Sequence, residues 1–598
     1  MRIKLSNYIS NFFVKNGIKD CFMVTGGGAM HLDDAFGHQE GMKVTFNHHE
    51  QACSIAAEAY ARITNKLPVV CVTSGPGGTN AITGVMGAWL DSIPMFVLSG
   101  QVKRETTTWS CPDIGLRQLG DQEFDIINSV SNMTKYCVMV TEPNDIAYHL
   151  EKALFLSLNG RKGPVWLDIP LDVQGSMIET DELRHFDSSE IENEIKGIKD
   201  DELNHILDKL QKAKSPLMLV GTGIRLSNAE EELLKLVNKL QIPVVTAWNA
   251  NDVLAYDNDY FVGMPGTIGT RPGNFAIQNC DVLLSIGCRL NIRMIGYNHF
   301  DFAKNAYKIV VDIDKKELMK PTLKIDCPIN SDAKYFINKI LEKEYTPNLE
   351  HKKWLLWCKD LLNKYPATLK EYHNTSTDMI NPYVFIDNLF SKTINEDRII
   401  CGNGSACVIT FQASKIKQGQ RMFTNSGCAA MGYGLPAALG VAVSDNSKRT
   451  ICIDGEGSIM MNIQELSTIV HNNLNVKIFL INNNGYLSIR QTQTNLFKPP
   501  FIGIDKESGI SFPNFEKLAT AFGLKYKRID NEDESLAKIE EVLNNNGPCL
   551  CEVIVDWHQN FAPKSSSKVL PDGRIVSPSL DDMAPFLDRD EFNKIKYE

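Results

Sequence analysis

Acidic and amide side chains end two apolar segments in the last third of the chain. The segment 451–453 leads into Asp454-Gly455-Glu456-Gly457-Ser458, and the segment 476–481 ends in Asn482-Asn483-Asn484-Gly485-Tyr486. Carboxylate and amide oxygens are ligands that Mg²⁺ prefers, and phosphate oxygens can fill its remaining positions. Gly457 and Ser458, opening a helix, would offer backbone N–H groups to the same phosphate. The pattern predicts a magnesium and phosphate site, although Gly-Glu-Gly-Ser alone is also compatible with an ordinary β-turn.

A second candidate group surrounds Glu50, which follows His48 and His49 and precedes the small-residue segment 52–61. A glutamate in an apolar crevice has a raised pKa and can act as a general acid or base. The alternative is a helix N-terminal glutamate stabilised by the helix dipole. Because the two adjacent histidines lack partners four residues on, we assign them no metal role.

Short apolar runs alternate with longer amphipathic stretches throughout the chain. Such fully apolar strands, separated by helices, are typical of parallel sheets covered on both faces, so the predicted fold class is α/β. The runs that carry this prediction are 67–72, 95–98, 165–169, 217–220, 282–286 and 476–481.

Two charge-rich segments, at about 179–201 and 338–377, interrupt this alternation as linkers between domains would. We therefore expect three doubly wound parallel-sheet domains at 1–180, 190–345 and 375–560, and the first and third could share a fold. The proline-containing segment 561–598 is predicted to be a C-terminal arm that could close over the site as a lid.

Composition excludes several classes of protein. The chain has 598 residues and a formal net charge of -10, so it offers no global basic field for nucleic acid or an anionic membrane. Its 15 cysteines contain no CxxC pair, which favours reduced thiols in the cytoplasm over a disulfide framework or a zinc site. No signal peptide or membrane span is expected.

The spacing of 27 residues from Glu456 to Asn483 resembles the signature of thiamine-diphosphate-dependent enzymes, Gly-Asp-Gly followed by some 25 to 30 residues and Asn-Asn. The segment 461–467 resembles the large subunit of acetolactate (acetohydroxyacid) synthase. The resemblance implies metal ligands at Glu456, Asn483 and Gly485. Glu456 stands where the family has Asp, and Asp454 is the alternative ligand.

The family's remaining motifs recur in order, and they imply cofactor contacts. Glu50 would bind the aminopyrimidine ring and act as general acid/base through it, while Gln101 would face the reacting carbon. Met431 would support the bent cofactor. The other cofactor-binding residues implied are Gly26, Gly27, Asn80, Ser405, Gly455, Gly457, Ser458, Asn483, Gly485 and Tyr486.

The middle domain loosely resembles the part of acetolactate synthases that holds FAD. Arg161, which precedes Gly163-Pro164, and Arg289 would contact the flavin nucleotide. The alternative is a domain that has kept these loops and lost the flavin, as in related decarboxylases.

Three residues define the expected acceptor pocket. Asp121 and Gln122 stand where the family has Phe-Gln, and Thr492 replaces a tryptophan. The loss of two large rings and the gain of a carboxylate predict a wider, more polar pocket. We therefore expect a carboligase that transfers a two-carbon unit from pyruvate to a bulky carbonyl acceptor such as a keto sugar nucleotide.

Three alternatives stay open: an acetolactate synthase catalytic subunit, a flavin-dependent pyruvate oxidase, and a non-catalytic cofactor-binding protein. The family also implies a homodimer or homotetramer, because the Glu50 half and the metal half of such sites come from different chains.

Overall fold

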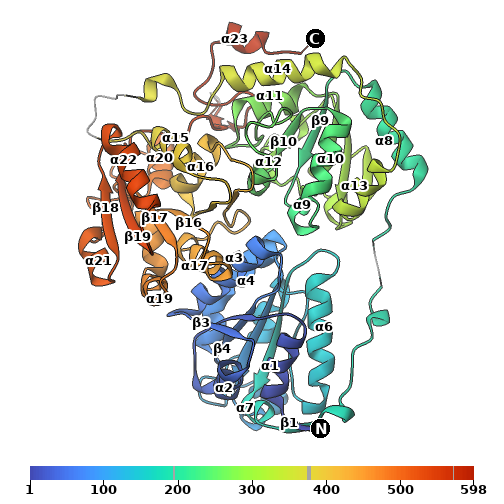
Figure 1. The fold of residues 1–598 in the computed structure, drawn as a ribbon, viewed down its shortest axis with the longest axis vertical. Helices are drawn as coiled ribbons and strands as arrows, with labels where there is room; N and C mark the ends of the chain where they lie inside the picture. Colours follow the sequence, from blue (N-terminus) through green and yellow to red (C-terminus); the bar gives the residue numbers. More distant parts are fainter. Residues whose placement is uncertain (193–194, 374–378, 570–571, 598) are drawn as a thin grey trace.

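Three parallel β-sheets covered by helices make up most of the chain (Figure 1). The structure is a computed structural model that describes residues 1–192, 195–373, 379–569 and 572–597. All six apolar runs predicted to be strands lie in these sheets, and Val282–Ile286 matches its strand from end to end. The predicted α/β fold class is therefore confirmed.

The N-terminal sheet has six parallel strands in the order β3-β2-β4-β5-β7-β6. Its strands are β2 (Asp20–Met23), β3 (Lys43–Phe46), β4 (Val69–Val72), β5 (Met95–Gln101), β6 (Cys137–Met139) and β7 (Pro164–Pro170). Its helices are α1 (Leu5–Lys15), α2 (Met30–His38), α3 (Glu50–Thr64), α4 (Pro76–Asp91), α5 (Ile126–Val130), α6 (Ile146–Leu158) and α7 (Leu171–Gln174). An antiparallel pair, β1 (Arg2–Lys4) with β8 (Met177–Glu179), joins the two ends of this unit.

The middle sheet has five parallel strands in the order β10-β9-β11-β12-β13. Its strands are β9 (Pro216–Val220), β10 (Val244–Thr246), β11 (Val282–Ile286), β12 (Tyr307–Asp312) and β13 (Cys327–Asn330). The accompanying helices are α8 (Asp200–Lys212), α9 (Gly223–Leu226), α10 (Glu230–Leu240), α11 (Arg271–Asn279), α12 (Ile292–Ile295) and α13 (Ala333–Leu341).

Helix α10 illustrates why these segments are helical. Leu233, Leu236, Val237 and Leu240 recur at helical spacing and are all buried, so one face packs on the sheet. Three glutamates occupy its first turn and Lys239 its last, which complements the helix dipole at both ends.

The segment 338–377, expected to be a linker, contains helix α14 (His351–Lys364). Trp354 of this helix is fully buried and its indole N–H donates to the Pro216 carbonyl at 2.8 Å. The expectation of a bare linker was wrong, because the charged residues of α14 lie on its outer face and hide an apolar stripe that packs on the middle domain.

The C-terminal sheet has six parallel strands in the order β15-β14-β16-β17-β19-β18. Its strands are β14 (Arg398–Cys401), β15 (Arg421–Phe423), β16 (Thr450–Gly455), β17 (Val476–Asn482), β18 (Lys525–Ile529) and β19 (Cys549–Ile554). Its helices are α15 (Pro382–Lys392), α16 (Gly404–Ala413), α17 (Gly434–Ser444), α18 (Glu456–Ile459), α19 (Glu465–His471), α20 (Leu487–Leu496), α21 (Phe515–Ala521) and α22 (Glu532–Leu543). If the strands of each sheet are numbered from the first one in that sheet, both sheets have the order 2-1-3-4-6-5. The N- and C-terminal sheets therefore share a topology.

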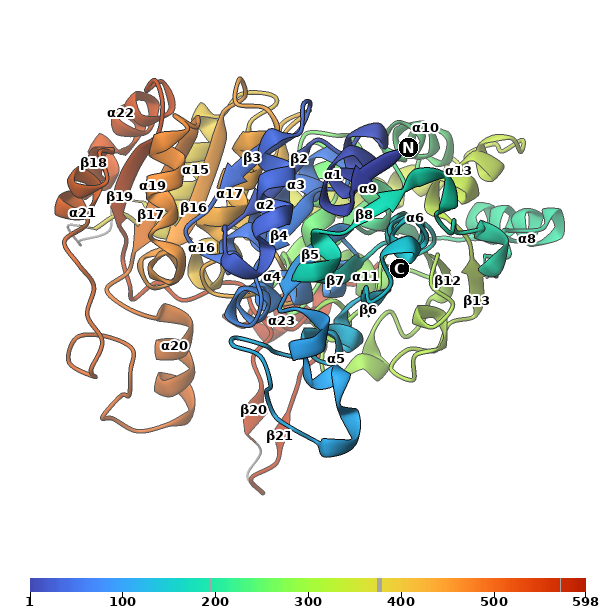
Figure 2. The ribbon, with the colours of Figure 1, turned by 90° about the horizontal axis from the view of Figure 1, so that it is seen from below.

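The segment after β19 lies along the middle domain as an arm. It contains the antiparallel pair β20 (Lys568–Val569) and β21 (Ile575–Val576) and the short helix α23 (Arg589–Lys594), which lies near α14 (Figure 1). Arg271 donates to the carbonyl of Met583 at 3.2 Å, and the ring centroids of Tyr597 and Trp354 are 4.8 Å apart. The arm is therefore anchored at its far end, while the β20–β21 pair and α20 project from one side of the molecule (Figure 2).

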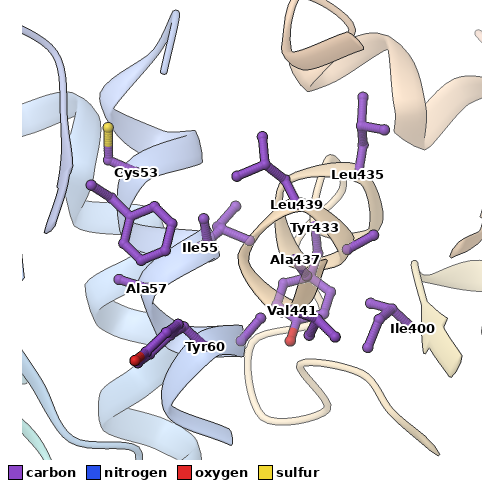
Figure 3. Packing of buried hydrophobic residues seen from close by; sticks show 14 of the residues in the cluster. Cys53, Ile55, Ala57, Tyr60, Ile400, Tyr433, Leu435, Ala437, Leu439 and Val441 are labelled. Atoms are coloured by element: carbon purple, nitrogen blue, oxygen red, sulfur yellow. The ribbon is translucent and has the colours of Figure 1, made fainter. Parts of the chain in front are cut away.

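The N- and C-terminal units pack together through α3 and α17. Ile55 of α3 lies on the side of that helix turned toward Leu439 and Val441 of α17, and all three belong to one buried hydrophobic cluster (Figure 3). The two helices approach closely, since a Cβ added at Gly440 would lie 2.0 Å from the carbonyl oxygen of Ala56. This shared core fixes α3, and with it Glu50, relative to the C-terminal sheet.

Two further observations concern the chemistry of the chain. All fifteen cysteines are free thiols, most of them buried. In the described residues, no helix is both long enough and apolar enough to cross a membrane.

Candidate active site

The predicted binding loops follow neighbouring strands between which the strand order of the sheet reverses. These strand pairs are β2 and β4, β14 and β16, and β9 and β11. In such doubly wound sheets the crevice at the carboxyl ends of the two central strands is the usual ligand site. The segment 24–28 follows β2 and the segment 73–80 follows β4; in the C-terminal sheet, Ser405 follows β14 and Glu456 follows β16. In the middle sheet, the segments 221–223 and 287–293 follow β9 and β11 in the same way.

Glu456 and the loop 482–486 form the centre of the C-terminal group. The Glu456 side chain is buried, and its Oε1 accepts hydrogen bonds from the backbone N–H of Asn483 at 3.1 Å and of Gly485 at 2.7 Å. The Asn483 amide donates to Ser405 Oγ at 2.9 Å. The structure therefore brings together Glu456 and Asn483, the pair whose spacing suggested the site, with Ser405 and Gly485, which only the family resemblance implied.

Burial dominates the electrostatics of this group. It raises the pKa of Glu456 to about 7, even though the N–H groups of Gly485 and Asn483 and the charge of Arg490 act to lower it. Burial likewise raises the pKa of Asp454 to about 7. Two carboxyl groups with raised pKa values are suited to a site where a bound cation compensates their negative charge.

Two buried oxygen atoms in this group have no protein partner. They are Oδ1 of Asn483 and Oδ2 of Asp454. Hydrogen-bonding groups are rarely left unpaired in a protein interior, and a hard cation is one explanation. In the described residues, no three His, Cys, Asp or Glu side chains gather as a metal cluster, so a metal here would need amide or backbone oxygens as well. The donor set fits Mg²⁺ held by Glu456, Asn483 and the backbone at Gly485.

The residues expected around the phosphates surround the start of α18. A Cβ added at Gly455 would lie 4.0 Å from the Ile481 carbonyl oxygen, in ordinary van der Waals contact, whereas one added at Gly457 would lie 1.9 Å from the ring of Tyr486. Ser458 Oγ accepts from the Gly432 N–H at 3.0 Å, which ties the start of α18 to the loop carrying the half-buried Met431.

The N-terminal group centres on the segment 73–80. Asn80 Nδ2 donates to Glu50 Oε2 at 3.0 Å; Glu50 is the first residue of α3 and Asn80 the fifth residue of α4. Gly26 packs against the side chain of Thr73, with the exposed Gly27 beside it. His49 caps α3 through its Nδ1, which accepts from the Gln51 N–H at 3.0 Å, so this histidine has a structural contact.

Contacts within one chain bring the surroundings of Glu50 to the C-terminal unit. Asn47 Nδ2 donates to Glu465 Oε2 at 2.9 Å, and the His48 N–H donates to Glu465 Oε1 at 3.0 Å. Among the residues described, however, no hydrogen bond or ion pair joins Glu50 to Glu456 or to Asn483. The two halves of the predicted site are therefore held by one scaffold without direct contact in this chain.

Gln101 lies at the end of β5 with its amide turned into the N-terminal unit. Its Nε2 donates to the carbonyl of Phe124 at 2.9 Å and to Asp168 Oδ2 at 3.1 Å, and its Oε1 accepts from the Val102 N–H. The side chain is buried. Its expected position facing the reacting carbon stays a prediction, and the structure does not bring it next to the C-terminal group.

The expected acceptor residues lie at two separate places. Asp121 and Gln122 are exposed, and the carbonyl of Gln122 packs on Gly75, just before α4. Thr492 is exposed on α20, where its hydroxyl donates to the Ser488 carbonyl at 3.0 Å. Within the described residues, no hydrogen bond or ion pair joins Asp121 or Gln122 to Thr492.

A cavity of about 730 Å³ lies where the three units meet. Arg161 and Arg289 both line it, together with the segments 221–223, 311–313 and 426–429. Arg161 donates to Asp314 Oδ2 and Glu317 Oε1, each at 2.9 Å. The volume is that of a small-molecule or cofactor site, and the two predicted flavin contacts share it.

No function was assigned from the sequence to three buried charged residues that lie in or near the site. Glu465 accepts from Asn47 and His48, Glu58 accepts from the Tyr433 hydroxyl at 2.8 Å, and Arg490 contacts the loop after β17. Glu465 and Glu58 lie inside segments that resemble the family, and Arg490 stands two residues before Thr492 in a segment compared with it, so a signal was present for all three.

Three family models match the chain in order: the thiamine pyrophosphate enzyme N-terminal TPP binding domain at 3–129, the central domain at 203–340 and the C-terminal TPP binding domain at 402–553. Thiamine pyrophosphate is another name for thiamine diphosphate.

Curated relatives are similar over nearly the whole chain. The acetolactate synthase large subunit of Cyanidium caldarium is 31% identical, with 94% of this chain and 95% of the relative covered. Acetolactate synthase 2, chloroplastic, of Nicotiana tabacum is 32% identical, with 94% and 83% covered. The isozyme 2 large subunit of Escherichia coli (strain K12) is 30% identical, with 95% and 97% covered. The chain thus belongs to the thiamine pyrophosphate enzymes, as a carboligase similar to acetolactate synthase large subunits.

Proposed function

We propose that this enzyme decarboxylates pyruvate and joins the remaining two-carbon unit to a second 2-keto acid, as the names of its relatives indicate. The main observation that supports this proposal is the similarity to acetolactate synthase large subunits over more than nine tenths of the chain. Bound thiamine diphosphate would supply the carbanion chemistry, with Mg²⁺ as the metal that links its diphosphate to the C-terminal group.

The chain's own residues have distinct parts in this proposal. Glu50, held by Asn80, would exchange a proton with the aminopyrimidine ring. Glu456 and Asn483 would hold the metal, while the buried surroundings exclude water from the charge that develops. Glu50→Gln should then lower decarboxylation about 100-fold or more, measured as CO₂ released from pyruvate.

One assay tests the reaction. Purified enzyme with pyruvate, thiamine diphosphate and Mg²⁺ should form acetolactate, identified by product mass. If CO₂ is released from pyruvate without acetolactate, this acceptor is wrong although the decarboxylation stands.

A bulky carbonyl acceptor, such as a keto sugar nucleotide, is the second candidate. It is favoured by the exposed Thr492 on α20, where a tryptophan was expected, and by the exposed carboxylate of Asp121. None of the relatives' names supports it. Adding a keto sugar nucleotide to the same assay should give a product heavier than this acceptor by one acetaldehyde equivalent, C2H4O, if this candidate holds, with CO₂ released from pyruvate.

FAD binding belongs to the proposal as well. The cavity of about 730 Å³ and its two arginines support it. Flavin absorbance in the purified protein would test it, and oxygen- or quinone-dependent turnover of bound flavin would instead favour a pyruvate oxidase.

We further propose a homodimer or homotetramer, because family membership implies that the Glu50 half and the metal half of one site come from different chains, and the described residues show no hydrogen bond or ion pair between them within one chain. The relatives are named large subunits, which also makes a second subunit type part of the proposal. For location we keep the cytoplasm as a prediction, supported by the fifteen free thiols. Light scattering of the purified chain, alone and with a candidate second subunit, would test the assembly.

A further inference from the structure

The loop between β17 and α20 lies between two buried groups of opposite charge. On one side, Oε1 of Glu456 accepts from the N–H groups of Asn483 and Gly485. On the other, Arg490 donates to the carbonyl of Asn483 at 3.2 Å and to that of Asn484 at 2.6 Å. The peptide groups of the loop are therefore oriented from both sides, which fixes its conformation more firmly than either side chain alone.

Gly485 shows how tightly this loop is enclosed. Its φ is +136°, and an added Cβ would lie 2.0 Å from the Ile504 carbonyl oxygen and 3.0 Å from Arg490 Nη2. The N–H of the next residue, Tyr486, donates to the same Ile504 carbonyl at 2.9 Å. The loop thus contacts the backbone of Ile504 on one side and the Arg490 guanidinium on another.

The guanidinium of Arg490 is directed to the loop more than to a counter-ion. Arg490 is 7% exposed, and its Nη2 lies 3.4 Å from Asp505 Oδ2 and only 2.6 Å from the Asn484 carbonyl. The Trp557 ring, with its centroid 4.9 Å from the guanidinium carbon, packs against it. A planar donor that can bond two carbonyls at once cannot be replaced by lysine without losing a contact.

We infer that Arg490 is a positioning residue for the metal site: it holds the loop so that Oδ1 of Asn483 stays buried without a protein partner and available to a divalent cation. This inference rests on the proposed use of thiamine diphosphate with Mg²⁺. Arg490 touches neither the metal nor the substrate in this role, and it acts through the backbone of Asn483 and Asn484.

The test measures metal binding directly, with Mn²⁺ as a paramagnetic substitute for Mg²⁺. Free Mn²⁺ is counted by electron paramagnetic resonance in the presence of saturating thiamine diphosphate, for wild type, Arg490→Lys and Arg490→Met. Loss of a residue that orients a metal ligand typically weakens metal binding about 10- to 100-fold, so Arg490→Met should fall in that range and Arg490→Lys between it and wild type.

Arg528→Met is the matched control. Arg528 lies on β18 of the same sheet, is half exposed and pairs with Asp530, so its loss should leave Mn²⁺ binding unchanged. Excess Mg²⁺ should also restore the turnover number of Arg490→Met, which a general loss of structure would not allow.

Unchanged Mn²⁺ binding in Arg490→Lys and Arg490→Met would overturn the inference. If Arg490→Met does not fold, judged by thermal unfolding, Arg490→Lys alone decides, and binding equal to that of wild type overturns it. A wild-type protein that binds no Mn²⁺ with thiamine diphosphate refutes the proposed cofactor use as well, so the two failures are distinguishable.

Discussion

Two buried carboxyl groups stand within three residues of each other at the end of β16, and they differ in surroundings. Asp454 is enclosed by backbone, since a Cβ at Gly402 or Gly434 would lie 1.9 or 2.5 Å from its carboxylate oxygens. Glu456 instead reaches the loop that carries Asn483. A hydrated cation needs room and several oxygens at once, which favours the Glu456 side of this pair.

Neutralising Glu456 should therefore impair metal binding more than neutralising Asp454. We expect Glu456→Gln to weaken Mn²⁺ binding about 10- to 100-fold, and Asp454→Asn to weaken it by much less. Both variants keep side-chain length, and thermal unfolding checks that both fold. The reverse order of effects would identify Asp454 as the ligand.

Asp168 offers a pH test away from the metal site. It is buried on β7 and accepts from Ser99 Oγ at 2.6 Å and from Gln101 Nε2 at 3.1 Å, and burial raises its pKa to about 7. An unfolded aspartate has a pKa of about 3.9, so the folded protein binds this proton more tightly. The contribution of Asp168 to stability should therefore fall as pH rises from about 4 to about 7.

Asp168→Asn cannot ionise, so relative to wild type it should be more stable at about pH 8 than at about pH 5. Urea unfolding of both proteins at the two pH values measures this difference. Asp113→Asn, at an exposed position, is the control and should show no such trend. A difference that is constant with pH would mean that Asp168 does not titrate in this range.

At the scale of elements, the contact between α3 and the start of α17 fixes the N-terminal unit relative to the C-terminal unit within one chain. Tyr433, next to the loop of Met431 and Gly432, donates its hydroxyl to Glu58 Oε2 at 2.8 Å. Glu58 lies on α3, two turns after Glu50, and also pairs with Arg62. This hydrogen bond crosses from the C-terminal unit to the N-terminal unit inside their common core.

Tyr433→Phe should destabilise the protein by about 1–3 kcal/mol, because it removes the hydrogen-bond donor to a buried carboxyl oxygen. For a chain of 598 residues that unfolds as one unit, a difference of this size should appear as a drop of about 1–2 °C in the midpoint of thermal unfolding. It should also weaken thiamine diphosphate binding, measured by titration calorimetry. Tyr60→Phe, which removes a 2.6 Å bond to Asp20 inside the N-terminal unit, should lower the midpoint without weakening cofactor binding. Equal cofactor binding by all three proteins would contradict the positioning role of Tyr433.

These elements also show what could be read from the sequence. Strands such as Val282–Ile286 were predictable because a central parallel strand is apolar on both faces. Glu456 and Asn483 were predictable as a pair because adjacent parallel strands end at one edge of a sheet, and β16 pairs with β17 in that register. Helix α14 was missed because its charged face masks the stripe that includes Trp354.

Contacts between segments far apart in the chain could not be predicted from the sequence. The bond between Tyr433 and Glu58 spans 375 residues, and nothing local to either residue indicates it. Arg490 was missed for a related reason, since an arginine on a short amphipathic helix is usually exposed, and only the fold shows that it faces the loop 483–485.

At the scale of the whole molecule, one buried carboxylate links three units. Asp252, between β10 and α11 in the middle unit, pairs through Oδ1 with Arg225 at 3.2 Å and through Oδ2 with Arg421 of β15 at 2.9 Å. Arg421 in turn donates to the carbonyl of Arg62 on α3 at 3.1 Å. The middle, C-terminal and N-terminal units therefore meet at the guanidinium of Arg421.

The charge of Asp252 should stabilise this junction only while it is ionised. Burial acts to raise its pKa, but Arg225, Arg421 and the Met422 N–H outweigh burial, and the pKa lies below its ordinary value. A carboxyl group with a lowered pKa contributes stability above its unfolded pKa of about 3.9 and loses it as pH falls through the folded value.

Asp252→Asn should consequently destabilise the protein by about 3–5 kcal/mol near neutral pH, because among the described residues it leaves the Arg421 guanidinium without its paired carboxylate and Arg225 with Glu230 as its only paired carboxylate. The difference from wild type should shrink below about pH 4, where the wild-type carboxyl group also becomes neutral. Urea unfolding across this range measures both effects. Asp530→Asn, in an exposed pair with Arg528, should cost no more than about 1 kcal/mol at any pH. If Asp252→Asn were as mild as this control, the three units would be held together by their apolar interfaces, such as the contact of α3 with α17, and the charged junction would add nothing to their cohesion.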